Sequence, residues 1–192
     1  SQYEYPLIYP EDGWVEIDPR VLMDSVTKSL NYIDKNDIEL ISITNQRETT
    51  IVWEKQSGEP IYNAIVWQDR RTSQYCESIR TDNLEKNIQD KTGLILDPYF
   101  SATKIKWILE NVSGAKEKAA NGELCFGTVD TYLMYKLSEG KIFKTDITNA
   151  SRTMLFNINT LSWDAELLDI FGIDKSLLPE VVMSDSSFGR IK

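Results

Sequence analysis

The residues of this chain that are best suited to chemistry are four consecutive polar residues, Asn45, Gln46, Arg47 and Glu48. A run rich in β-branched residues precedes them at 41–44, and another follows at 49–52. This pattern predicts a strand, a polar corner and a second strand. The Arg47 guanidinium is a planar fork of hydrogen-bond donors, and an ionised Glu48 carboxylate is an acceptor, so the pair suits a ligand with several hydroxyl groups.

The sequence pattern alone allows two interpretations of the Arg47–Glu48 pair. Neighbours on a regular strand point to opposite faces, so the two side chains can share a ligand only if the chain bends at this point. A solvated turn that carries an Arg/Glu pair explains the same residues without any ligand.

Two aromatic residues are candidates for the wall of such a site. Trp67 ends the apolar run 61–67, and in open α/β sheets ligands bind beyond the carboxyl ends of strands. An indole face suits the C–H face of a sugar or polyol. Tyr99 follows Asp97 and Pro98 in a constrained loop, where its hydroxyl can donate and accept. Packing alone would explain either aromatic residue equally well.

A further polar cluster lies late in the chain, at Asp146, Asn149, Ser151 and Arg152. We interpret it as a turn held by side-chain to backbone hydrogen bonds.

Composition excludes several classes of function. The chain has 192 residues, a net charge of −9 and no histidine, which removes Ser-His-Asp catalysis and the common His-based zinc sites. No cluster of Lys and Arg suits nucleic acid, and the apolar runs are too short for a membrane span. Cys76 and Cys125 have no metal-like spacing and predict reduced thiols, which indicates a cytoplasmic protein. The scattered glycines form no phosphate-binding loop.

The elements that must position these residues alternate between strands and helices, which predicts an α/β fold. A turn is expected at 10–13 and a loop at 92–99, and Ser101 and Thr128 are expected to cap helices. Strands are expected over residues 1–9, 39–44, 49–54, 61–67, 124–127, 141–145 and 152–157. Helices are expected over residues 19–34, 73–80, 83–91, 101–109, 114–121, 129–139 and 164–170.

Five blocks of the sequence resemble the FGGY carbohydrate kinases and, within them, the glycerol kinases: residues 43–50, 62–72, 97–104, 126–131 and 148–153. The resemblance runs from Trp14 to about Glu180. It implies an actin-like, ribonuclease-H-type ATPase fold with a mixed sheet flanked by helices. It also implies phosphorylation of a terminal hydroxyl of glycerol by ATP with Mg²⁺, which gives glycerol 3-phosphate. By motif match, Arg47 and Glu48 would bind the glycerol hydroxyls, Tyr99 would add a contact, and Trp67 would line the pocket.

The resemblance also implies parts that this chain does not contain. In the family a phosphate loop precedes the position of Ser1, and the aspartate that acts as general base and the second, ATP-binding domain follow the position of Lys192. We therefore expect residues 1–192 to be an incomplete N-terminal, glycerol-binding domain. We expect no residue of the chain to act in catalysis or to bind cofactor or metal, and the chain alone to be inactive. The missing strands would leave 39–44 with an unpaired edge, or residues 1–9 would cover it, so we expect self-association or strand pairing unlike that of the intact kinase. We also expect a homo-oligomer.

Two other functions fit parts of the same sequence. One is an FGGY kinase for another polyol or sugar, which the Arg47–Glu48 pair and the Trp67 block disfavour. The other is a non-catalytic polyol-binding or regulatory module that lacks the ATP machinery by nature.

Overall fold

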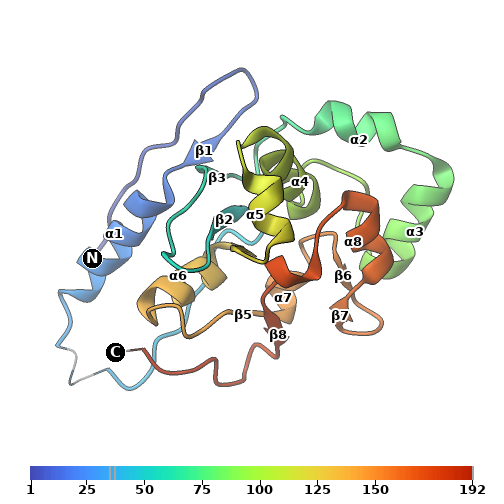
Figure 1. The fold of residues 1–192 in the computed structure, drawn as a ribbon. Coiled ribbons are helices and arrows are strands. Elements are labelled where there is room, and N and C mark those ends of the chain that lie inside the picture. Colours follow the sequence, from blue (N-terminus) through green and yellow to red (C-terminus); the bar gives the residue numbers. More distant parts are fainter. Residues whose placement is uncertain (35, 37, 192) are drawn as a thin grey trace.

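A layer of short strands crosses the middle of the computed structural model, which describes residues 1–34, 36 and 38–191 (Figure 1). Two antiparallel pairs make up the layer, β1 with β3 and β2 with β4. An isolated bridge between Thr50 and Ile65 joins the pairs, so the order across the layer is β1, β3, β2, β4. The bounds are β1 Glu16–Ile17, β2 Ile51–Glu54, β3 Ala64–Ile65 and β4 Leu124–Gly127.

Two smaller pairs lie in the second half of the chain. β5 (Lys144–Asp146) pairs in parallel with β8 (Glu180–Val182). β6 (Phe156–Asn157) and β7 (Ser162–Trp163) form an antiparallel pair. The strands are therefore mixed in direction, as the family resemblance implied.

Most of the helices begin and end where local signals predict. Asp18 caps the first helix by accepting from the Arg20 backbone N–H at 2.9 Å, and Gly93 ends the third with φ at +72°. Ser101 is the first helical residue of α4 rather than its cap, a position that Phe100 takes without a side-chain bond. The helices are α1 Pro19–Leu30, α2 Ser73–Ile79, α3 Asp82–Thr92, α4 Ser101–Asn111, α5 Ala115–Ala120, α6 Val129–Leu137, α7 Ile147–Ala150 and α8 Ala165–Phe171, with a short 3₁₀ turn, η2, at Lys175–Leu177.

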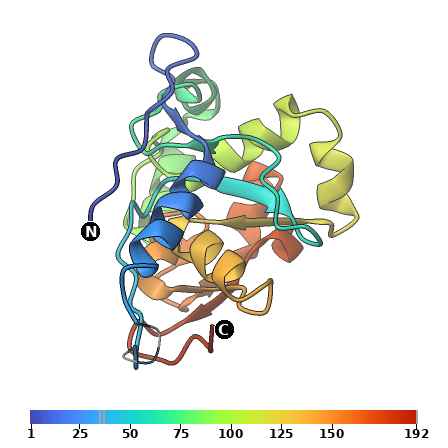
Figure 2. The same cartoon turned by 90° about the vertical axis from the view of Figure 1, so that its left-hand side faces the viewer.

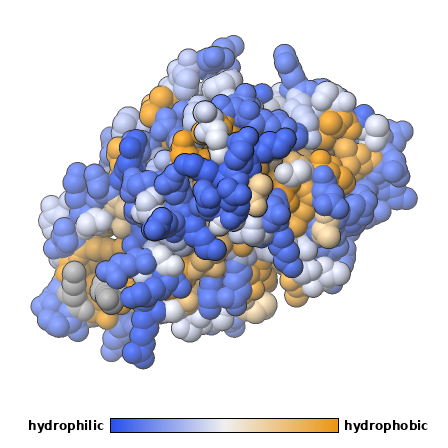
Figure 3. Space-filling view, in the orientation of Figure 1, coloured by the Kyte–Doolittle hydropathy of each residue, from blue (hydrophilic) through white to orange (hydrophobic). Residues whose placement is uncertain are grey.

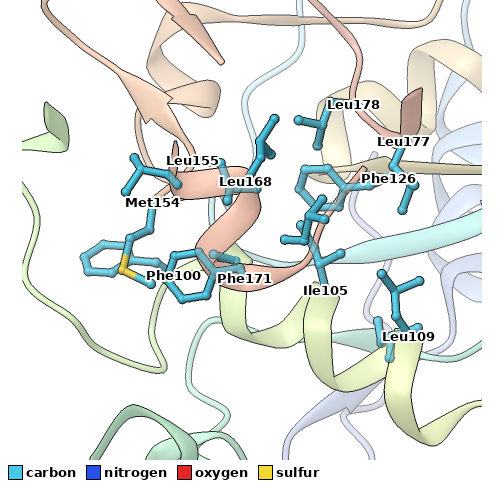
Figure 4. Close-up of a cluster of buried hydrophobic side chains, with 14 of the residues drawn as sticks. Phe100, Ile105, Leu109, Phe126, Met154, Leu155, Leu168, Phe171, Leu177 and Leu178 are labelled. Atoms are coloured by element: carbon cyan, nitrogen blue, oxygen red, sulfur yellow. The ribbon is translucent and has the colours of Figure 1, made fainter. Parts of the chain in front are cut away.

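The strand layer separates two apolar cores, because alternate residues of a strand face opposite sides. Val52 of β2 packs in the larger core with α4, α5 and α8, whereas Ile51 and Trp53 pack in the smaller core with α1 and α6. Figure 2 shows α1 and α6 to one side of the layer and α5 to the other. Figure 4 shows the larger core, where α4 meets α8 and Phe126 of β4. Hydrophilic side chains dominate the face in Figure 3, with apolar patches between them.

The strand expected at 39–44 does not form. Residues 41–45 alternate between half-buried and exposed, and Ile43 packs against the smaller core, so the chain has the extended period of a strand. No ladder partner lies beside it in the described part of the chain. Leu40 is 84% exposed. The apolar pattern thus predicted the conformation correctly, but a strand also needs a neighbour to receive its hydrogen bonds.

Residues 1–9 were also expected to form a strand, and this prediction is wrong. Ile8 alone makes a bridge, with Glu16, through two backbone hydrogen bonds of 2.9 Å. Pro6 and Pro10 lack the N–H that a ladder requires, which limits pairing to the three residues between them.

Three further strands are shorter than expected, whereas β4 has the expected bounds. The 61–67 run keeps only β3, because Tyr62 and Asn63 turn their side chains to the Glu16 carboxylate at 2.6 and 2.8 Å. The run expected at 141–145 begins only at Lys144, and that at 152–157 begins only at Phe156, after a turn with Met154 at φ +65°.

A buried arginine fastens the strand layer to α4. The Arg71 side chain is fully buried, with Nη2 2.7 Å from Glu16 and 2.8 Å from Asp69. Its guanidinium lies between the rings of Trp14 and Trp107, at 3.8 and 4.5 Å from their centroids. Because Glu16 belongs to β1 and Trp107 to α4, Arg71 joins elements that do not adjoin in sequence.

Replacing Arg71 by Met should lower the free energy of unfolding by about 3–5 kcal/mol, because two buried carboxylates lose their partner. Arg70→Met is the matched control, since the neighbouring Arg70 side chain is 54% exposed in its pair with Asp97. We expect that change to cost less than about 1 kcal/mol. Urea denaturation of both variants measures the difference, and equal losses would contradict the role given to Arg71.

Candidate functional site

The polar corner is a turn that separates its two charged residues. The Thr49 backbone N–H donates to the Gln46 carbonyl at 3.3 Å and closes the turn. Glu48 points inward and is only 4% exposed, whereas Arg47 lies at the surface. Arg47 makes no hydrogen bond or ion pair with the described residues. The bend that the sequence requires is therefore present, although the two side chains do not contact one another.

Glu48 is the centre of a group that we call the corner cluster: Glu48, Arg152, Tyr99 and Trp67. Arg152 Nε donates to Glu48 Oε1 at 2.7 Å. The Arg152 guanidinium lies 5.6 Å from the centre of the Tyr99 ring, and the Tyr99 and Trp67 rings are 5.6 Å apart. The structure thus brings three of the four predicted site residues together, with Arg47 beside them on the turn.

Arg152 is the member of the cluster that sequence reasoning missed. The side-chain to backbone bond expected in this cluster is present, because Asp146 accepts from the Asn149 backbone N–H at 2.8 Å, but residues 147–150 form the short helix α7 rather than a turn. The contact of Arg152 with Glu48 spans 104 residues, and no local spacing could have revealed it. The one available signal was the position of Arg152 inside the resembling block 148–153.

The entry to the corner is fastened to α7. Asn45 Nδ2 donates to Asn149 Oδ1 at 3.0 Å. Burial acts to raise the pKa of the Asp146 carboxyl, but hydrogen bonds from Ser184, Thr148 and Asn149 outweigh it and hold that pKa below its usual value. An ionised Asp146 therefore fixes the turn from which Arg152 reaches Glu48.

The loop that carries Tyr99 is fixed by Asp97. Its Oδ1 accepts from the Tyr99 backbone N–H at 2.8 Å and from Arg70 Nη1 at 3.0 Å. Pro98 predicted a constrained loop, and the hydrogen bond between the Asp97 side chain and the Tyr99 backbone constrains it further.

A buried lysine lies beneath both segments. Lys104 is fully buried, and its Nζ donates to the Tyr99 carbonyl at 2.6 Å and to the Glu48 carbonyl at 3.3 Å. Burial lowers the pKa of Lys104 to about 7, although the charges of Asp69, Glu48 and Asp97 oppose this shift. Within the described residues no carboxylate forms an ion pair with it.

Other parts of the molecule offer less for chemistry. Cys76 and Cys125 are free and buried, and burial raises the pKa of both thiols to about 11. The described residues contain no group of three or more His, Cys, Asp or Glu side chains placed to hold a metal ion.

An open hollow of about 380 Å³ is lined by residues 109–117, at the end of α4 opposite to Lys104. Its residues carry no aromatic face and no buried charge, so the corner cluster is the stronger candidate.

No helix of the described chain combines the length and the apolar character needed to span a bilayer.

The family profile for the FGGY family of carbohydrate kinases, N-terminal domain, matches residues 1–192. This chain belongs to the FGGY carbohydrate kinases. Its fold is accordingly the actin-like ATPase fold of those kinases.

Relatives of this FGGY chain include glycerol kinases. The glycerol kinase of Shewanella woodyi is 54% identical over 198 residues, covering 100% of this chain and 40% of the relative. The crystal structure of Plasmodium falciparum glycerol kinase with ADP has a TM-score of 0.91 at 38% identity, covering 99% of this chain and 39% of that one. A gluconate kinase of Lactobacillus acidophilus has a TM-score of 0.83 at 28% identity, covering 99% of this chain and 38% of that one. The chain therefore spans about 40% of the length of the curated relative it matches.

Replacing Lys104 by Met should change how stability depends on pH. The pKa of Lys104 is about 7 when folded and 10.5 ordinarily. Between these values the unfolded state binds more protons, so this lysine makes the free energy of unfolding rise with pH. Relative to Lys104→Met, the unaltered chain should gain up to about 1.4 kcal/mol per pH unit above about pH 7. Urea denaturation between about pH 7 and pH 9 measures this gain.

Lys106→Met is the control, because Lys106 lies on the same helix in a partly exposed pair with Glu110. It should follow the pH dependence of the unaltered chain. Parallel curves for the unaltered chain and Lys104→Met would show that the lysine is not buried as described.

Proposed function

We propose that the protein to which this chain belongs is a glycerol kinase, which transfers a phosphoryl group from ATP to a terminal hydroxyl of glycerol and forms glycerol 3-phosphate. The observation that carries the proposal is the corner cluster, in which a buried carboxylate pairs with an arginine that lies over the Tyr99 ring, and the Tyr99 ring meets that of Trp67. The 54% identity to a relative named glycerol kinase supports the same substrate.

The polar groups around the corner are suited to a small polyol. Glu48 Oε1 is occupied by Arg152, and Glu48 Oε2 has no partner among the described residues, so it can accept from a substrate hydroxyl. The Tyr99 hydroxyl and the Arg47 guanidinium are also without partners in the described part of the chain. Glycerol hydroxyls both donate and accept, which matches a set that contains both kinds of group. Trp67 would cover the C–H face of the polyol.

The pairing with Arg152 prepares Glu48 for this role. Arg152 pairs with the nearly buried Glu48 carboxylate and holds one of its oxygens in place, so the direction of the second oxygen is fixed as well. Preorganisation of this kind matters for a small ligand, whose few contacts must offset its lost freedom of motion.

The transfer of phosphate itself is assigned to the whole protein. We propose ATP as the phosphoryl donor and Mg²⁺ as its metal, but the described residues contain no fitting metal-ligand group, so no ligand is assigned within residues 1–192. We place this chain as an incomplete N-terminal, glycerol-binding domain and propose that it does not phosphorylate glycerol alone, because phosphoryl transfer depends on groups around the phosphates. We also propose a cytoplasmic location, in agreement with two free thiols, and a homo-oligomeric state.

In the full-length protein, Arg47→Ala and Glu48→Ala should each lower kcat/KM for glycerol by about 1.5–3 kcal/mol, the usual contribution of a charge-assisted hydrogen bond. A coupled ADP-release assay with glycerol, Mg²⁺ and ATP measures the loss. Arg20→Ala and Glu77→Ala are controls of the same charge, since both side chains are mostly exposed.

Unchanged kinetics in both corner variants would remove the substrate-binding assignment. A full-length protein that phosphorylates a different polyol or sugar in preference to glycerol would favour another FGGY kinase activity. One that binds glycerol without ATP turnover would favour a polyol-binding module.

A further inference from the structure

We propose that Lys104 is a positioning residue for the substrate pocket, in which its amine joins the main chain of the corner at Glu48 to the main chain of the loop at Tyr99 and sets the spacing between the two. The proposal rests on the proposed function, because the spacing matters only if both segments bind the same polyol.

The contacts of Lys104 are with the two residues whose side chains form the pocket. Its Nζ lies 2.6 Å from the Tyr99 carbonyl oxygen and 3.3 Å from the Glu48 carbonyl oxygen. Ser101, one turn earlier on α4, adds a weaker bond from its hydroxyl to the Glu48 carbonyl at 3.4 Å. Lys104 therefore touches the main chain of both residues and leaves their side chains free for substrate.

Apart from Lys104, few contacts link the corner to the Tyr99 loop directly. The corner is held to α7 through Asn45, and the Tyr99 loop is held to Arg70 through Asp97. These anchors tie each segment to a different partner. Lys104 joins the main chains of both segments through a single group, whereas Arg152 contacts their side chains and Ser101 adds one weaker bond.

A buried lysine is an unusual choice if stability alone matters. The Lys104 side chain is fully buried, and none of the nearby carboxylates of Asp69, Glu48 and Asp97 forms an ion pair with it in the described part of the chain. A charged amine is costly to bury without an anionic partner. Met has nearly the same length and no such cost. If position 104 served only to fill the core, Met would be the better residue. A side chain that sets the spacing of two carbonyls needs at least two N–H donors, which an amine supplies in either protonation state.

The test compares three variants of the full-length protein by steady-state kinetics and thermal unfolding. Lys104→Met removes the donors and keeps the length. Lys104→Gln keeps two N–H donors on a side chain one atom shorter and without charge. Lys106→Met is the matched control, because Lys106 lies two residues further along α4 with its amine 2.7 Å from Glu110.

We expect Lys104→Met to raise the KM for glycerol at least tenfold, with the KM for ATP changed less than twofold and the melting temperature not lowered. Lys104→Gln should recover part of the loss, and Lys106→Met should match the unaltered protein. An unchanged KM for glycerol in Lys104→Met would overturn the proposal. So would parallel losses in glycerol KM, ATP KM and melting temperature, which indicate a structural role only.

If Lys104→Met does not fold, Lys104→Gln decides: a raised KM for glycerol with an unaltered KM for ATP supports the proposal, and unaltered values for both overturn it. The unaltered protein separates this inference from the proposed function. Absence of glycerol-dependent ADP release from that protein overturns the proposed function and the role of Lys104 with it. Normal turnover with an unaffected Lys104→Met overturns the role of Lys104 alone.

Discussion

The Glu48 carboxylate is nearly buried, and the site depends on the hydrogen bond that offsets the free-energy cost of this burial. A carboxylate removed from water is stable only where donors replace the water, and a charged N–H group is a strong donor of this kind. Arg152 supplies it at 2.7 Å from a turn 104 residues away. The pairing therefore requires that the fold bring the corner next to the residues that follow α7. The Tyr99 loop meets them there, because its ring lies against Arg152.

A second set of buried charges fixes the other side of the same region. Asp69 and Arg71 lie two and four residues after Trp67, and Arg71 reaches Glu16 of β1 between two indole rings. Trp67 therefore lies two residues before a member of this buried ion-pair network, and its ring meets that of Tyr99 at 5.6 Å between ring centres. Aromatic residues placed in this way move little, which is what a small substrate requires of the walls around it.

Capping residues and apolar runs in the sequence predicted the helix ends and the strand that depend on neighbouring residues. Asp18, Asp164 and Gly93 begin or end helices where expected, and β4 has the predicted bounds because its residues are buried on both faces between two cores. Strand 39–44 was predicted wrongly because alternation in sequence indicates an extended chain but does not supply a pairing partner. The site was predicted in part for the same reason. Glu48, Trp67 and Tyr99 stand out by residue type, whereas Arg152 and Lys104 matter through contacts that only the folded chain creates.

The most direct test is to observe the corner cluster while substrate is added. In the full-length protein labelled with ¹⁵N, the Nε–H signal of Arg152 and the indole N–H signal of Trp67 can be assigned by substitution and followed during a glycerol titration. Arg20, paired with Asp18, and Trp163, bonded to the Pro179 carbonyl, serve as reference signals. We expect the Arg152 and Trp67 signals to shift along one saturable curve while the reference signals stay in place. A protein that turns over glycerol while the Arg152 and Trp67 signals remain unmoved would contradict the account.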